Sequence, residues 1–448
     1  MSVGSTPSLN FIGDTVGDTG PHSMSEMRGI RFASGNSPTT GPISLSDFRN
    51  QVLNRDPVEQ AKIKSSDIQY LDSFGISVSL SGDGLYAIVG AVNESTGEPQ
   101  AGAAYIFKRT NASWSQQAKI QASTRQAQAY FGRSVSISDD GLYAISAADH
   151  EDIKGAAYIF NRTNSLWSQQ AKIQSSDIQN YDRFGYSVAI SGDGLYAIVG
   201  AMQESPNARG AAYIFKRTDS AWAEQAKITA SDKQDYDTFG WAVSISRDGS
   251  YAIVGARGED TGQTNAGAAY IFNRTNSTWA QQAKIQASDK QRNDYFGSSV
   301  SISGDGSYAI VGAPLADMTN EFDSGAAYIF KRSTNSSWAE QAKIEASDKQ
   351  GGSSFGYSVS ISGDGSHAIA GARGEDTGGS GSGAAYIFKR TNSTWAEQFK
   401  IKSSDIQSSD AFGTSVSISE DSSYVIGGAI LEDDEGAAYV FNNGYYIY

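Results

Sequence analysis

The sequence lacks cysteine and has few prolines and histidines. Its 448 residues include 8 Pro, 3 His and no Cys. Disulfide bonds and cysteine-based metal sites are therefore excluded. No zinc-type spacing of ligands appears, and no Ser/His/Asp arrangement recurs along the chain. The composition predicts a protein without catalytic residues, cofactor or metal.

Positive charge and long apolar runs are also scarce. The 35 Lys and Arg residues face 49 Asp and Glu residues, which gives a net charge of −14. A nucleic-acid partner would require a basic patch, so none is expected. No apolar run approaches the roughly 20 residues that span a bilayer, so no membrane insertion is expected. The first 30 residues lack a secretory signal, which leaves the cytoplasm, non-classical export, or a virion assembled inside a cell.

What the sequence does contain is a repeat. The dipeptide Phe-Gly occurs seven times at spacings of 53 to 59 residues, beginning at Phe74, Phe131, Phe184, Phe239, Phe296, Phe355 and Phe412. A period of this length indicates stacked supersecondary units. Repeats of this kind more often form binding platforms than catalysts.

Each repeat contains four short runs that are typical of strands. In the fifth repeat, residues 299–303 alternate between serine and an apolar residue, and Asp305-Gly306 follows as a hairpin signal. Residues 308–311 and 327–330 are apolar on both faces, so both faces must be covered. Residues 338–345 have a polar face that suits an outer strand. Four such antiparallel strands form one propeller blade.

The two ends of the chain indicate how the ring closes. Gln60-Ala61-Lys62-Ile63 is a spare copy of the fourth-strand motif, whereas the last repeat stops at residues 437–441 without a fourth strand. Pairing these segments would remove both free edges. We therefore expect an all-β fold, a seven-bladed propeller of four-stranded antiparallel blades, over residues 56–448. An irregular N-terminal arm, residues 1–55, is expected to precede it, with a short helix from about Leu45 to Leu53.

The repeat resembles the FG-GAP family, the seven-bladed propeller of integrin alpha chains and many microbial surface proteins. The resemblance lies in Phe355-Gly356-Tyr357-Ser358-Val359 and Gly312-Ala313-Pro314, and it covers about residues 58–441. Family members commonly carry a calcium loop with several carboxylates. The matching segment here, residues 301–306, has only one carboxylate, Asp305, so the resemblance does not predict a calcium site in this chain. The Asp-Gly pair is interpreted instead as the turn of a β-hairpin.

The arm carries a second resemblance. Residues 41–49, with the sequence GPISLSDFR, look like a short segment near the start of structural proteins of tailed phages, cyanophages in particular. The resemblance implies a virion protein whose arm, residues 1–55, docks to other virion proteins. The residues expected to anchor it are Ile43, Leu45, Phe48 and Arg49.

The loops between the second and third strands and the loops between blades should emerge at one end of the propeller. They vary most between repeats, as expected of a scaffold with a variable surface. Exposed aromatics beside acids can hold sugars or protein, although packing under the loops or plain solubility would explain the same residues. The candidate ligand-binding residues are Tyr186, Trp241, Tyr357, Tyr236, Asp317, Glu321, Asp323, Glu432 and Asp433.

Three functional hypotheses follow from these features. The first is a non-enzymatic virion protein, located on a phage tail or capsid, that serves host attachment or decoration and meets a host surface protein or glycan. The second is a cellular adhesion or scaffold propeller, extracellular or on the cell surface. The third is an enzyme with its site in the central channel, which an ordered carboxylate cluster there would support. A homo-oligomer is compatible with all three.

Overall fold

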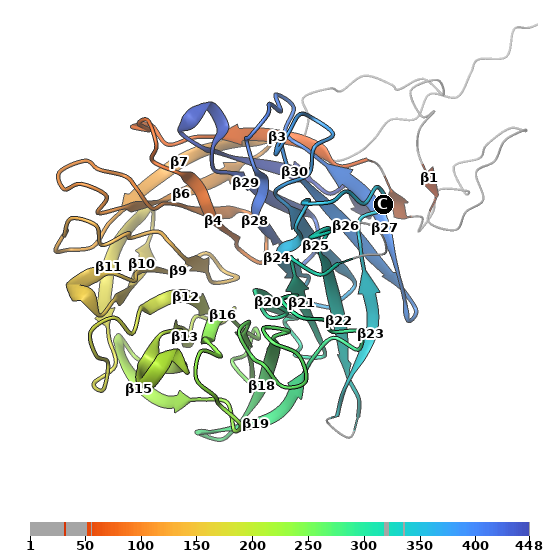
Figure 1. The fold of residues 1–448 in the computed structure, drawn as a ribbon. Coiled ribbons are helices and arrows are strands. Elements are labelled where there is room, and N and C mark those ends of the chain that lie inside the picture. Colours follow the sequence, from red (N-terminus) through yellow and green to blue (C-terminus); the bar gives the residue numbers. More distant parts are fainter. Residues whose placement is uncertain (1–30, 33–51, 55, 318–321, 335–336, 448) are drawn as a thin grey trace, which may run out of the picture.

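The computed structural model describes residues 31–32, 52–54, 56–317, 322–334 and 337–447. Within this part, seven four-stranded antiparallel sheets stand around a common axis (Figure 1). They are the blades of a propeller, so the predicted fold is confirmed.

In six of the seven blades the four strands lie in chain order from the axis outward, and in the last blade the first three do (Figure 1). The innermost strands are β4 (Phe74–Leu80), β8 (Val135–Ile137), β12 (Phe184–Ile190), β16 (Phe239–Ile245), β20 (Ser299–Ile302), β24 (Phe355–Ile361) and β28 (Phe412–Ile418). The second strands are β5 (Tyr86–Ala91), β9 (Tyr143–Ala148), β13 (Tyr196–Ala201), β17 (Tyr251–Ala256), β21 (Tyr308–Ala313), β25 (His367–Ala372) and β29 (Tyr424–Ala429). The third strands are β6 (Ala103–Thr110), β10 (Ala156–Thr163), β14 (Ala211–Thr218), β18 (Ala268–Thr275), β22 (Ala326–Arg332), β26 (Ala384–Thr391) and β30 (Ala437–Asn442).

The outer strands complete the blades. They are β7 (Ser113–Ile120), β11 (Leu166–Ile173), β15 (Ala221–Ile228), β19 (Thr278–Ile285), β23 (Trp338–Ile344), β27 (Thr394–Ile401) and, in the last blade, β3 (Val58–Ile63). We number the blades 1 to 7 from the blade of β4 to the blade of β28. Short helices η2 (Glu151–Ile153), η3 (Glu204–Ala208) and η4 (Glu432–Asp434) lie between second and third strands.

The hydrophobic core lies between the blades. Its buried side chains form seven clusters in the described part of the chain, and each cluster combines residues of two adjacent blades. The second strand β21 is buried at all six positions, and β22 is buried at its first five. These strands are apolar on both faces because a neighbouring blade covers each face.

The Phe-Gly pairs lie at the start of the innermost strands or shortly before it, and they hold adjacent blades close together. The ring of Phe74 packs against Tyr105 and Phe107 of its own blade, at 5.6 and 6.1 Å, and lies in a buried cluster that includes Tyr424 of the neighbouring blade. Gly75 has a φ of 95°, and a Cβ there would lie 2.5 Å from the carbonyl oxygen of Ala437 in the neighbouring blade. Glycine meets both demands, because it adopts positive φ without strain and leaves room for that backbone.

The ring closes as the sequence predicted. β3 pairs antiparallel with β30, with Val58 opposite Asn442 and Ile63 opposite Ala438. The last blade therefore combines strands from the two ends of the repeat region, and neither blade 1 nor blade 7 is left with an incomplete sheet.

In six of the seven blades, a lysine in the outer strand pairs with an acid of the loop that precedes the blade. In blade 4, Lys284 Nζ lies 2.6 Å from Asp232 of the preceding loop and 2.7 Å from Glu259 of its own blade. The hydroxyl of Tyr270 also donates to Asp232. The lysines that bind two acids in this way are Lys62, Lys119, Lys227, Lys284 and Lys400. Two blades depart from the pattern. In blade 2, Lys172 contacts Glu151 and Asp152 of its own blade, and in blade 5, Ala316 stands where the other blades have the acid of the second-to-third-strand loop.

A small sheet joins the segment before the propeller to the end of the chain. It contains β1 (Arg31–Phe32), β2 (Val52–Asn54) and β31 (Tyr445–Ile447), with β2 in the middle. The expected helix is wrong at its C-terminal end, because Val52 and Leu53 pair with β31 and satisfy their backbone groups there. The rest of that helix and the four anchoring residues, Ile43, Leu45, Phe48 and Arg49, lie outside the described residues, and the boundary at residue 55 stays a prediction.

Truncation tests the closure. Deleting residues 1–64 removes β3, exposes the edge of β30 and should abolish most of the thermal stability. Deleting residues 1–50 leaves β3 in place and should change the melting temperature little. Differential scanning calorimetry of the two truncations measures this, and equal melting temperatures would contradict the role assigned to β3.

The lysine network gives a second prediction. Lys284→Met leaves the buried Glu259 carboxylate without its cation and should destabilise the protein by about 1–3 kcal/mol, the cost of an unsatisfied buried polar group. Lys343→Met in blade 5 is the matched control, because Ala316 replaces the buried acid there. Thermal melts compare the two variants. An equal loss of stability in both would show that the unpaired Glu259 carboxylate does not cause the destabilisation.

Candidate binding sites at the two ends of the channel

The loops between second and third strands and the loops between blades meet at one end of the propeller, which we call the loop end. Each blade-to-blade loop hydrogen-bonds the second-to-third-strand loop of the blade before it. Leu71 N donates to the carbonyl of Asp434 at 2.7 Å, and Tyr236 N donates to that of Asn207 at 2.8 Å. The predicted grouping of the variable loops is confirmed.

Three of the predicted aromatics follow Phe-Gly pairs at the loop end of the innermost strands. The rings of Tyr186 and Trp241, on adjacent blades, have centroids 4.7 Å apart. Tyr357 is close enough to Tyr186 for the two hydroxyls to influence each other electrostatically. All three side chains are half-buried. The structure therefore brings these residues together at the loop-end mouth of the channel.

Two arginines that the sequence analysis did not select complete this group. The guanidinium of Arg257 lies 3.2 Å from the centre of the Trp241 ring, and that of Arg373 lies 4.0 Å from the centre of the Tyr357 ring. Burial lowers the pKa of Arg257 from its ordinary value. We call the five residues Tyr186, Trp241, Arg257, Tyr357 and Arg373 the arginine–aromatic cluster.

The two arginines of the cluster differ from their neighbours in having no acidic partner. Arg133 and Arg183 both contact the buried carboxylate of Asp149, at 2.8 and 2.9 Å. Arg257 and Arg373 form neither a hydrogen bond nor an ion pair with any residue in the described ranges. Their N–H groups are therefore available to a ligand.

The Arg-Gly-Glu segments that contain these arginines are not exposed recognition tripeptides. Glu259 is 1% exposed and pairs with Lys284. A Cβ on Gly258 would collide with the carbonyl oxygen of Tyr236. Only the arginine of the segment reaches the mouth.

The other predicted site residues are divided by the structure. Tyr236 is 67% exposed at the loop end, and Asp317 and Asp323 are exposed in a loop of blade 5. Glu321 lies outside the described residues. Glu432 is buried and pairs with Lys62, so it is not a surface acid, and Asp433 pairs with Lys64 at 2.9 Å. These two acids hold the closing strand, because the lysines belong to β3 and the residue after it.

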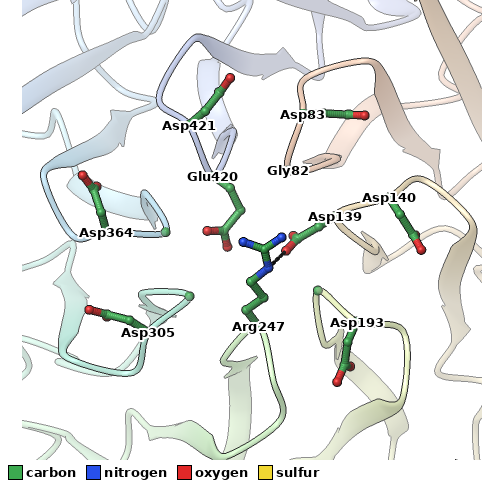
Figure 2. Close-up of a pocket in the computed structure, with 13 residues that line it drawn as sticks. Gly82, Asp83, Asp139, Asp140, Asp193, Arg247, Asp305, Asp364, Glu420 and Asp421 are labelled. Atoms are coloured by element: carbon green, nitrogen blue, oxygen red, sulfur yellow. Dashed lines mark ion pairs between the residues drawn. The ribbon is translucent and has the colours of Figure 1, made fainter.

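The opposite end of the channel, which we call the turn end, holds a cavity of about 930 Å³. The turns between first and second strands line it. Asp139, Arg247 and Glu420 point toward one another at its centre (Figure 2), with Arg247 Nε 3.0 Å from Asp139 Oδ2. The sequence analysis missed these residues. The available signal was a repeat position that holds glycine in the other blades, at Gly82, Gly192, Gly304 and Gly363.

Glycine at those positions makes room for the three charged side chains. A Cβ on Gly363 would overlap Glu420 Oε2, and a Cβ on Gly192 would overlap Asp139 Oδ2. Burial raises the pKa of Glu420 to about 7, and the charge of Asp139 adds to this effect. Burial likewise raises the pKa of Asp139 to about 6 against the opposing effect of Arg247.

The remaining aspartates of these turns serve the hairpins. Asp83 Oδ1 accepts hydrogen bonds from Ser81 Oγ at 2.6 Å and from Leu85 N at 2.9 Å. Each of these hairpin aspartates already uses a carboxylate oxygen within its own turn. The described residues contain no group of three or more His, Cys, Asp or Glu side chains placed to hold a metal ion. They do not fit the calcium loop of related propellers.

The raised pKa of Glu420 makes stability depend on pH. The folded protein keeps a proton on Glu420 that the unfolded chain releases above about 4.5, so this contribution is present at low pH and is lost as the pH rises through about 7. Glu420→Gln should therefore raise the melting temperature at pH 8 and leave it nearly unchanged at pH 4.5. Glu224→Gln, at an exposed position of β15, is the control. No gain at pH 8 for Glu420→Gln would contradict the assignment.

Comparison with known proteins agrees with this architecture. In the described ranges, no helix has the length and apolar character needed to cross a membrane. No curated protein matches the chain. The model of the FG-GAP repeat matches seven times, once for each blade, at residues 57–107, 114–160, 167–215, 222–272, 279–330, 338–388 and 395–441. These matches cover most of the sequence, and the chain therefore belongs to the FG-GAP repeat family.

Proposed function

We propose that this protein is a non-enzymatic binding module that holds its ligand at the loop-end mouth of the propeller. The observation that carries the proposal is the arginine–aromatic cluster. Its aromatic rings come from three blades, and its two arginines have no acidic partner in the described part of the chain. Partly exposed aromatic and guanidinium groups are the side chains that most often dominate binding interfaces.

The setting of this module is a finer proposal. Residues 41–49 resemble the start of tailed-phage structural proteins, and this supports a virion protein assembled in the host cytoplasm. In this proposal residues 1–55 dock to other virion proteins, and the propeller is displayed on a tail or capsid for host attachment or decoration. The alternative is a cellular adhesion or scaffold propeller, extracellular or on the cell surface, that binds protein or glycan with the same mouth.

The turn-end cavity favours a second candidate function, acid–base catalysis. Two carboxyl groups with raised pKa values lie in one cavity, and such groups are common in catalytic sites. We rank this candidate below binding because Arg247 already neutralises Asp139 and because structural ion pairs also shift pKa values. Glu420→Gln distinguishes the two, since it would abolish catalysis but leave binding at the loop end unchanged.

Particles that carry altered chains test the binding proposal and its setting together. Replacing Tyr236, Trp241 and Tyr357 with alanine should reduce adsorption to host cells at least tenfold while the particles keep a normal content of the chain. Deleting residues 1–50 should instead remove the chain from the particles. Melting temperatures of the purified chains show whether each variant is folded.

Two outcomes would contradict these proposals separately. Normal adsorption of particles carrying the folded triple variant would show that the mouth does not bind and would favour decoration. Absence of the full chain from any particle would refute the virion setting and leave the cellular alternative.

A further inference from the structure

The arginine–aromatic cluster places positive charge at the mouth of an acidic protein. The chain has a net charge of −14, yet Arg257 and Arg373 meet no acid among the described residues. Arg257 is half-buried, which costs free energy unless a partner restores its hydrogen bonds, whereas Arg373 is exposed. A ligand with an anionic group would supply the missing acceptors.

The stacking of Arg257 determines how it can bind such a group. Its guanidinium lies 3.2 Å from the centre of the Trp241 ring, so one face of the plane is covered. The N–H groups lie at the edge of that plane and remain free to donate. An edge of this kind binds a carboxylate through two parallel hydrogen bonds.

Exposed tyrosines lie in the blade-to-blade loops at the same end of the propeller. Tyr181 and Tyr236, which occupy equivalent positions in two successive blade-to-blade loops, are 69% and 67% exposed, and Tyr70, one position earlier in its own loop, is 70% exposed. Each offers a flat apolar face with a hydroxyl at its edge. Equivalent faces on two successive loops suit a ligand that is itself a repeat, because successive units can then make the same contact.

We propose that the loop-end mouth binds an acidic polysaccharide, with the carboxylates of its sugars on Arg257 and Arg373 and its sugar rings against the surrounding tyrosines. This inference rests on the proposed binding function and specifies its ligand. A nucleic acid is the competing polyanion, and the experiment below distinguishes it from the polysaccharide.

Equilibrium binding of polygalacturonic acid to the full chain tests the proposal. The methyl-esterified polymer, which has the same sugars without free carboxylates, should bind at least tenfold more weakly. Arg257→Gln and Arg373→Gln should each weaken binding of the free acid about tenfold, which is the effect of losing one hydrogen-bonded charge partner. Arg292→Gln is the matched control, since it removes the same charge from an exposed position in a loop at the same end.

Several outcomes would overturn the proposal. They are no binding by the unaltered chain, equal binding of the esterified polymer, or an equal loss in the Arg292→Gln control. Tighter binding of single-stranded DNA than of the polyuronate would favour a nucleic acid instead. If any of these occurs while the alanine variants of Trp241 and Tyr357 still lose adsorption, the ligand class is wrong and the binding function stands. If adsorption is also unaffected, the binding function itself fails.

Discussion

The whole structure depends on the fact that no blade can bury its own faces. The second and third strands of a blade are apolar on both sides, and every hydrophobic cluster in the described chain is shared by two neighbours. Each blade therefore needs two partners, and a linear row would leave two blades half-covered. Closure through β3 and β30 removes that deficit. The Phe-Gly pairs and the outer-strand lysines serve the same contact between blades, one beside the axis and the other near the rim.

The fold could be predicted from the sequence because every blade has to make the same contacts with its neighbours, so the same residues recur in every repeat. The spare Gln60-Ala61-Lys62-Ile63 and the missing strand after Phe441 identified the closing pair, which the register of β3 on β30 confirms. The arm was harder to predict. A capping pattern favoured a helix up to Leu53, but a strand at the far end of the chain offered Val52 and Leu53 better backbone partners.

The sites were only partly predictable, because a shared repeat position is visible in the sequence but a contact between distant blades is not. Tyr186, Trp241 and Tyr357 were found because they share one repeat position beside the channel. Arg257 and Arg373 also share a repeat position, but only the folded structure shows that neither has an acidic partner. Glu432 shows the opposite case. It was taken for a surface acid, yet it holds Lys62 of the closing strand. At the turn end, Asp139, Arg247 and Glu420 meet only because the ring brings three distant turns to one point.

The shared last blade also sets the order of events during synthesis. β3 is the first propeller strand to leave the ribosome, and β30, its partner, is the last. Bringing them together closes a loop that contains nearly the whole repeat region, and the entropic cost of a loop grows with its length. Blades 1 to 6 can each pair their own strands as they emerge, which shortens the effective distance between the two ends. The nascent chain must nevertheless carry an unpaired β3 until β30 has been synthesised.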